Sequence, residues 1–152
     1  MRRVKLYIAA DHRGYERKNL LKSEIKFSNL EIIDLGADKL ESSDDFVDYA
    51  QKLSLSILAD DAEAEQSLGI LICGSGQGMC MAANRFRGIR ACLPMTEHQA
   101  IASKREDDCN VICISADSLN LEKSIAIIEA WLESSFSFKQ RYIRRIEKLD
   151  QI

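Results

Sequence analysis

A glycine-rich segment after an apolar run is the part of this chain best suited to chemistry. The run Gly69–Ile72 ends at Cys73, and three glycines spaced two apart follow it, namely Gly74, Gly76 and Gly78. Glycines at these places let the backbone turn sharply and present its N–H groups to a ligand. Good helix formers occupy 79–86, so we expect the loop to open a helix. A helix N-terminus holds anions through unpaired N–H groups and the helix dipole.

Cys73 is the candidate base or nucleophile of this loop. A thiol at a helix N-terminus is expected to be more acidic than a free cysteine, because its thiolate is the stabilised form. The other four cysteines fall in apolar or helical stretches and are interpreted as packing residues: Cys80, Cys92, Cys109 and Cys113. No Cys-x-x-Cys or paired Cys/His spacing is present, so the sequence predicts no metal site.

The loop does not match the common phosphate or nucleophile motifs. It lacks the Gly-Lys-Ser/Thr ending of a P-loop, and its Gly-x-Gly-x-Gly spacing differs from that of dinucleotide-binding loops. Ser75 is not in a Gly-x-Ser-x-Gly setting and is therefore a poor hydrolase nucleophile. A purely structural turn remains the alternative for this segment.

Composition indicates one globular domain over residues 1–152. The chain has 152 residues, 46% of them hydrophobic, which suffices for one core. A net charge of −3 gives no electrostatic case for nucleic acid or an anionic membrane as partner. No apolar run approaches the roughly 20 residues that span a bilayer, and the N-terminal apolar stretch is too short for a signal peptide. We therefore expect a cytoplasmic protein.

Apolar runs alternate with helical patterns along the chain. Strands are predicted at 4–9, 31–35, 70–73, 89–93 and 111–115, and helices at 15–27, 46–58, 79–86, 97–106, 121–132 and 139–149. Asp44 or Asp45 can cap the second helix, and Thr96 the fourth. Continuously apolar strands indicate a parallel sheet covered on both faces. The fold class is thus α/β, a doubly wound, five-stranded, Rossmann- or flavodoxin-like three-layer sandwich with an extra C-terminal helix.

The expected strand order is 2-1-3-4-5, which places the topological switch between the first and third strands. Ligands of such sheets bind outside the carboxyl ends of the strands near that switch. The loop at 10–14, Ala-Asp-His-Arg-Gly, follows the first strand, and the glycine loop follows the third. We therefore expect the two loops richest in chemistry to meet.

Several segments together resemble the type B ribose-5-phosphate isomerases. The matching segments are Ala10–Gly14, Asp45–Ala50, Gly69–Met79, Ala82–Asn84 and Gly88–Ala91, and the resemblance runs in register over 4–149. The family also includes galactose- and allose-phosphate isomerases. The resemblance implies an aldose–ketose isomerase of the pentose phosphate pathway, acting on a sugar phosphate through a cis-enediolate without a metal or organic cofactor.

The resemblance also implies roles for individual residues. Cys73 would move a proton between C1 and C2, Ser75 would shuttle protons between O1 and O2, and Asp11 would contact sugar hydroxyls and assist ring opening. The enediolate would lie against the loop residues Gly74, Gly76, Gln77 and Gly78. The phosphate would be held by His12, Arg141 and Arg145. From the residues alone, Asp11 can be a helix cap, His12 a surface residue, and the arginines a solvated helix face.

The chain departs from the family pattern at four positions. Glu106 stands where relatives have the ring-opening histidine, and Asp107 where they have an asparagine. Asp117 replaces an arginine after the fifth strand, and Tyr142 replaces a histidine on the last helix. The added negative charge is expected to weaken phosphate binding and ring opening unless another group compensates. Glu106 can exchange a proton only if its pKa is raised.

Three functions are compatible with this pattern. The first is a ribose-5-phosphate isomerase, with Glu106 and Asp107 acting in catalysis and binding. The second is an isomerase of another sugar phosphate, such as allose or galactose 6-phosphate, or a subunit whose site a different partner subunit completes. The third is a non-catalytic sugar-phosphate-binding or structural protein. Because family members are dimers or tetramers with shared sites, a homodimer or homotetramer is expected.

Overall fold

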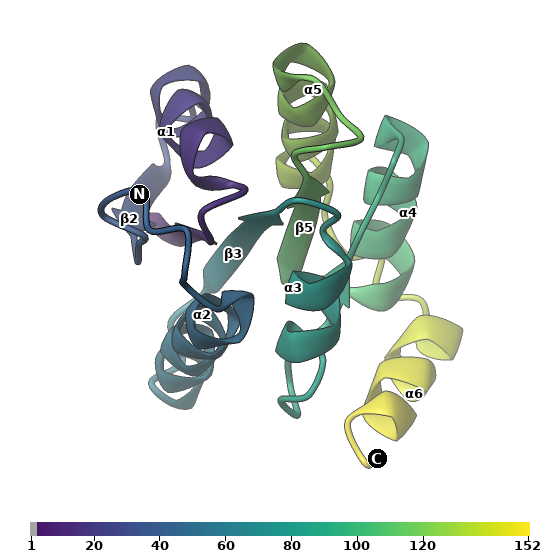
Figure 1. Ribbon diagram of the computed structural model, residues 1–152. Helices are drawn as coiled ribbons and strands as arrows, with labels where there is room; N and C mark the ends of the chain where they lie inside the picture. Colours follow the sequence, from purple (N-terminus) through teal and green to yellow (C-terminus); the bar gives the residue numbers. More distant parts are fainter. Residues whose placement is uncertain (1–2) are drawn as a thin grey trace.

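Five apolar runs form the strands of one parallel sheet, which lies between two layers of helices (Figure 1). This computed structural model describes residues 3–152, so the first two residues of the N-terminal stretch lie outside it. The strands are β1 (Val4–Ala10), β2 (Leu30–Asp34), β3 (Ser67–Cys73), β4 (Ala91–Cys92) and β5 (Val111–Ser115). The helices are α1 (Tyr15–Glu24), α2 (Phe46–Ala62), α3 (Gln77–Ala83), α4 (Glu97–Asp107), α5 (Leu121–Leu132) and α6 (Gln140–Leu149).

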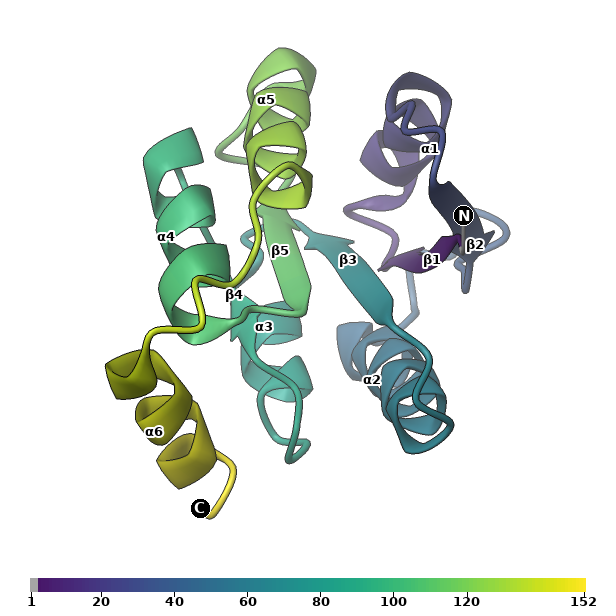
Figure 2. The same cartoon turned by 180° about the vertical axis from the view of Figure 1, so that it is seen from behind.

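The central strands are apolar on both faces because helices cover both. Leu6 and Ile8 of β1 point into a core shared with α1, α4 and α5. Tyr7 and Ala9 point into a second core, formed with α2 and α3. Figure 2 shows the same layers from behind, with α2 and α3 on the opposite side of the sheet from α1 and α5. The predicted three-layer α/β fold is confirmed.

The predicted strand order is wrong at one edge. The observed order is β2-β1-β3-β5-β4, so β5 rather than β4 lies beside β3. All five residues of β5 are buried, whereas the two residues of β4 are only partly buried. Pro94, which has no N–H to donate to a ladder, follows β4 closely. A short strand next to a proline is therefore placed at the sheet edge, and the fully apolar strand takes the interior position.

The exchanged order of β4 and β5 does not affect the topological switch point between β1 and β3. Ala10 at the end of β1 pairs with Ile72 of β3, and the Asp11 N–H donates to the Ile72 carbonyl over 3.3 Å. The β1–α1 and β3–α3 loops consequently lie side by side at the carboxyl edge of the sheet. The expectation that these loops meet is confirmed.

Helix starts follow the predicted caps only in part. Thr96 caps α4 by accepting a hydrogen bond from the Gln99 N–H. Asp45 occupies the N-cap position of α2, but its side chain makes no capping hydrogen bond, and the Asp44 carboxylate bonds His12 instead. Within residues 3–152, no helix combines the length and apolar composition needed to cross a bilayer.

Candidate functional site

The glycine loop encloses the thiol of Cys73. Cys73 is the last residue of β3 and 5% exposed, and its Sγ accepts a hydrogen bond from the Gly76 N–H at 3.2 Å. Gly76 has φ +76°, and a Cβ there would approach Leu93 Cδ1 to 2.4 Å, so only glycine fits. The loop is tied to β5, because Gly74 O accepts hydrogen bonds from Ser115 Oγ (2.8 Å) and the Asp117 N–H (2.9 Å).

Ser75 in this loop and Gln77 and Gly78 in the first turn of α3 complete the segment. Ser75 and Gln77 are exposed, and the Gln77 N–H donates to Ser75 Oγ at 3.2 Å. Gly78 faces the ring of Phe46, which a Cβ would approach to 2.7 Å. The structure thus brings the predicted loop residues together around Cys73.

The predicted acidity of Cys73 is wrong in direction. Burial raises the pKa of the thiol, and hydrogen bonds from the Met79 and Gly76 N–H groups offset this only in part. The charge of Asp11 raises the pKa further, whereas that of Arg13 lowers it. The dipole argument fails because the thiol is almost fully removed from water, which disfavours the thiolate.

Asp11 and His12 extend this half of the site from the neighbouring loop. Asp11 is buried, and its Oδ1 accepts hydrogen bonds from the Arg13 N–H (3.0 Å) and the Gly14 N–H (3.1 Å). Asp11 therefore also closes the turn before α1. Burial raises the pKa of its carboxyl, although the Gly14 N–H and the charge of His12 oppose this.

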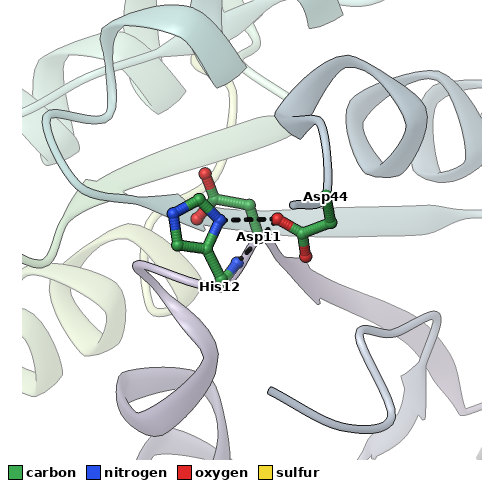
Figure 3. A group of neighbouring side chains, drawn as sticks. All are labelled: Asp11, His12 and Asp44. Carbon is green, nitrogen blue, oxygen red and sulfur yellow. Dashed lines mark hydrogen bonds and ion pairs between the residues drawn. The ribbon is translucent and has the colours of Figure 1, made fainter. Parts of the chain in front are cut away.

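Asp44 holds the side chain of His12 in place. Its Oδ1 accepts the His12 backbone N–H at 3.1 Å and lies 2.7 Å from His12 Nδ1 (Figure 3). The Asp44 side chain is 8% exposed. Burial alone would raise the pKa of Asp44, but hydrogen bonds from His12 and Tyr49 lower it. The carboxylate thus favours a proton on Nδ1 and leaves Nε2 for a ligand.

Asp11, His12 and Asp44 are also the residues to consider for a metal. Their ligand atoms lie within 4.8 Å of one another. The 2.7 Å between His12 Nδ1 and Asp44 Oδ1 is a hydrogen-bond distance, whereas two ligands of a tetrahedral zinc ion lie about 3.3 Å apart. The arrangement fits an acid–histidine hydrogen bond better than a pair of metal ligands.

Arg13 offsets the negative charge that Asp117 adds to this edge. The guanidinium of Arg13 forms an ion pair with the Asp117 carboxylate. It lies directly over Gly74, where a Cβ would approach Arg13 Cζ to 2.0 Å.

Glu106 and Asp107 lie at the opposite end of the parallel strands, where the strands begin. They end α4, and Val111 at the start of β5 follows them closely. Val111 pairs with Gly69 of β3, four residues before Cys73, which corresponds to about 13 Å along the strand. The structure therefore does not bring Glu106 and Asp107 to Cys73 within one chain.

Arg141 and Arg145 also lie at this end of the strands. Figure 2 shows α6 beside the end of α4, and the Ser137 N–H of the preceding linker donates to Arg105 O at 3.0 Å. The guanidinium carbons of Arg141 and Arg145 lie 4.7 and 5.9 Å from the ring centre of the buried Tyr142, and Arg141 Nη2 donates to its hydroxyl at 2.8 Å.

Arg145 is close enough to influence Asp107 of α4. Partial desolvation and the charge of Glu106 raise the pKa of Asp107, while Arg145 lowers it. Two of the three predicted phosphate ligands, Arg141 and Arg145, thus form a second group with Glu106 and Asp107, whereas the third, His12, lies with Cys73. The chain carries the two groups at opposite ends of its parallel strands.

Sequence reasoning missed two residues of the Cys73 group. Asp44 was interpreted as a helix cap, although an acid in the β2–α2 loop also lies at the carboxyl edge beside β1. Arg13 lies in the loop at 10–14, but its pairing with Asp117, 104 residues away, leaves no local signal in the sequence.

Known proteins are similar to this chain over nearly its whole length. The family model "Ribose/Galactose Isomerase" matches residues 6–149. A "probable ribose-5-phosphate isomerase B" of Mycoplasma pneumoniae is 39% identical over 95% of this chain and 91% of that protein. Ribose-5-phosphate isomerase B of Escherichia coli is 30% identical over 97% and 95%, respectively. A crystal structure of the Mycoplasma genitalium isomerase B with bound ribulose-5-phosphate superposes with a TM-score of 0.90, at 31% identity, covering 99% of this chain and 97% of that one.

Proposed function

Because this chain belongs to the ribose/galactose isomerase family, we propose that it interconverts ribose 5-phosphate and ribulose 5-phosphate. The observation that carries the proposal is a buried thiol at the end of β3, set among backbone N–H groups and beside the Asp11 carboxyl. Proton transfer next to a carbonyl needs a base and donors for the charge that develops on oxygen. Both are present at this place.

The proposed reaction begins on the open-chain aldose. The Cys73 thiolate removes the proton from C2, and the C–H electron pair forms the C1–C2 double bond as the carbonyl π pair moves onto O1. The N–H groups of the glycine loop stabilise the resulting enediolate. Ser75 moves a proton between O1 and O2, and the Cys73 thiol returns its proton to C1 to give the ketose. Asp11 binds the sugar hydroxyls and His12 the phosphate.

An isomerisation assay with Cys73 variants tests this function. Purified protein should convert ribose 5-phosphate to ribulose 5-phosphate, and Cys73→Ala should lower kcat by about 100-fold or more, because the base is lost. Cys80→Ser is the matched control, since Cys80 on α3 hydrogen-bonds Ala91 O at 3.5 Å and takes no part in the proposed reaction. Full activity of Cys73→Ala would rule out the mechanism.

We further propose that a second copy of the chain completes each site. Glu106, Asp107, Arg141 and Arg145 of one copy would then face the Cys73 group of another. The support is their position at the end of the strands opposite Cys73, together with their match to the family's functional positions. In a cyclic dimer both copies donate and receive these groups, which gives two equal sites.

Subunit mixing tests the shared site. Cys73→Ala and the double variant Arg141→Ala/Arg145→Ala should each be nearly inactive. Mixed and reassembled, they should recover about a quarter of the activity, because half of the dimers then carry one intact site out of two. Arg144→Ala, an exposed change on the same helix, is the control. An active monomer, or no recovery in mixed dimers, would contradict the shared site.

A six-carbon sugar phosphate is the second candidate substrate, because the matching family model covers both ribose and galactose isomerases. Parallel assays with ribose 5-phosphate, allose 6-phosphate and galactose 6-phosphate decide between them. Turnover of only a six-carbon substrate would replace the first proposal. Binding without turnover that survives Cys73→Ala would indicate a non-catalytic protein.

A further inference from the structure

The side chain of Arg13 occupies an unusual place for an exposed arginine. Its guanidinium lies where a side chain of Gly74 would begin, with Nε 2.3 Å and Nη1 2.4 Å from the position of an added Cβ. Gly74 directly follows Cys73 in the loop that encloses the thiol. The guanidinium therefore packs against the backbone of the proposed catalytic loop.

Asp117 determines where this guanidinium lies. Its carboxylate pairs with Arg13, and its N–H donates to Gly74 O at 2.9 Å. Asp117 is thus fixed to the same glycine that Arg13 covers. The side chains of Arg13 and Asp117 are 53% and 52% exposed, and an ion pair this open contributes at most about 1 kcal/mol to folding. Stability is a weak reason for this arrangement.

The glycine loop alone does not stabilise the Cys73 thiolate sufficiently, so a nearby positive charge has a role to play. Burial raises the pKa of Cys73, and the N–H groups of Gly76 and Met79 do not compensate fully. Two charged side chains of the β1–α1 loop act on it. Asp11 opposes the thiolate, whereas Arg13 favours it.

We propose that Arg13 is a positioning residue of the isomerase reaction, which Asp117 holds over Gly74 so that its positive charge stabilises the Cys73 thiolate. The inference rests on the proposed function, because it concerns the base of that reaction. Arg13 acts through Cys73 and takes no proton itself. The Cys73 sulfur remains the atom that removes the proton from C2 and returns it to C1.

The first test is the titration of Cys73 in the full-length protein. The carbon-13 resonance of its Cβ is followed against pH and assigned by its loss in Cys73→Ser. Arg13→Met should raise the midpoint by about half to one pH unit, which is a three- to tenfold loss of thiolate at pH 7. Arg13→Lys should stay closer to wild type. Arg144→Met, which removes an arginine from α6, is the control for net charge.

Asp117→Asn distinguishes the proposed role of Arg13 from a simple effect of net charge. The two explanations predict shifts of the Cys73 titration midpoint in opposite directions. If only net charge counted, removing a carboxylate would lower the Cys73 midpoint. The proposal expects the midpoint to rise, because Arg13 is no longer held over Gly74. An unchanged midpoint in Arg13→Met, or a lowered one in Asp117→Asn, would overturn the inference.

Kinetics distinguish this role from phosphate binding and from failure of the function itself. Arg13→Met should lower kcat with ribose 5-phosphate about three- to tenfold at pH 7, with KM and inhibition by inorganic phosphate unchanged. A raised KM with an unchanged titration would instead identify Arg13 as a phosphate ligand and overturn the proposal. If wild type does not isomerise any sugar phosphate, the proposed function fails, whereas the titration still decides whether Arg13 acts on Cys73.

Discussion

Replacing Asp44 should test whether the orientation of His12 depends on this buried carboxylate. Asp44 Oδ1 accepts two hydrogen bonds from His12, at 2.7 and 3.1 Å, and its side chain is 8% exposed. Asp44→Asn keeps the shape and both acceptor contacts but removes the charge. Asp44→Ala removes the acceptor as well. Asp45→Asn is the matched control, since the side chain of that neighbouring acid makes no capping hydrogen bond.

The magnitude follows from the kind of hydrogen bond lost. A hydrogen bond to a charged group contributes about 1 kcal/mol more than a neutral one, so Asp44→Asn should lower the free energy of unfolding by about 1 kcal/mol at pH 7. Asp44→Ala should cost about 2 kcal/mol, because water replaces only part of the two bonds at a ring that is 30% exposed. If His12 binds phosphate, KM for ribose 5-phosphate should rise about fivefold in Asp44→Asn.

Urea unfolding as a function of pH is the assay. The folded-state pKa of Asp44 is lowered, so its contribution is fully present above the unfolded value of about 3.9 and is lost as pH falls through the folded pKa. The stability difference between wild type and Asp44→Asn should therefore shrink in acid. Equal unfolding midpoints for wild type, Asp44→Asn and Asp44→Ala at pH 7 would refute the reasoning.

Three further changes test other parts of the structure. Glu106→His should raise kcat/KM on ring-closed ribose 5-phosphate several-fold if ring opening limits the reaction, while an unchanged or lower value would show that it does not. Gly14→Ala should destabilise by about 2–3 kcal/mol and impair turnover, because its Cβ would approach the backbone oxygen of Ile72 to 2.4 Å; a wild-type melting temperature would contradict this. Lys18→Met should cost about 2–3 kcal/mol in urea unfolding, since Lys18 is 1% exposed and bonds Asp34 at 2.8 Å; a loss below about 0.5 kcal/mol would show that the methionine compensates.

The fold was predictable from sequence because its strands are continuous apolar runs. Val111–Ser115 and the helix Leu121–Leu132 have the predicted bounds. The order of β4 and β5 was not predictable from periodicity, because both runs read as strands. It depends on which run can be buried on both faces and paired on both sides.

The candidate site was predictable only where its residues are close in sequence or lie on adjacent loops. Cys73 ends β3, and Asp11 and His12 follow the neighbouring strand β1, so the three residues meet. Glu106 precedes a strand, and in a parallel sheet that position lies at the opposite edge, a signal that motif matching overlooks. The direction of the Cys73 pKa shift depends on burial, which a local pattern of glycines does not reveal.

The short edge strand β4 restricts how copies of this chain can join. A free sheet edge pairs with another chain through its unpaired N–H and C=O groups. β4 offers only two ladder residues, and Pro94 beyond it has no N–H, so this edge is a poor template for strand addition. Any association of copies on this side of the sheet therefore has to use side chains presented by helices rather than backbone pairing between strands.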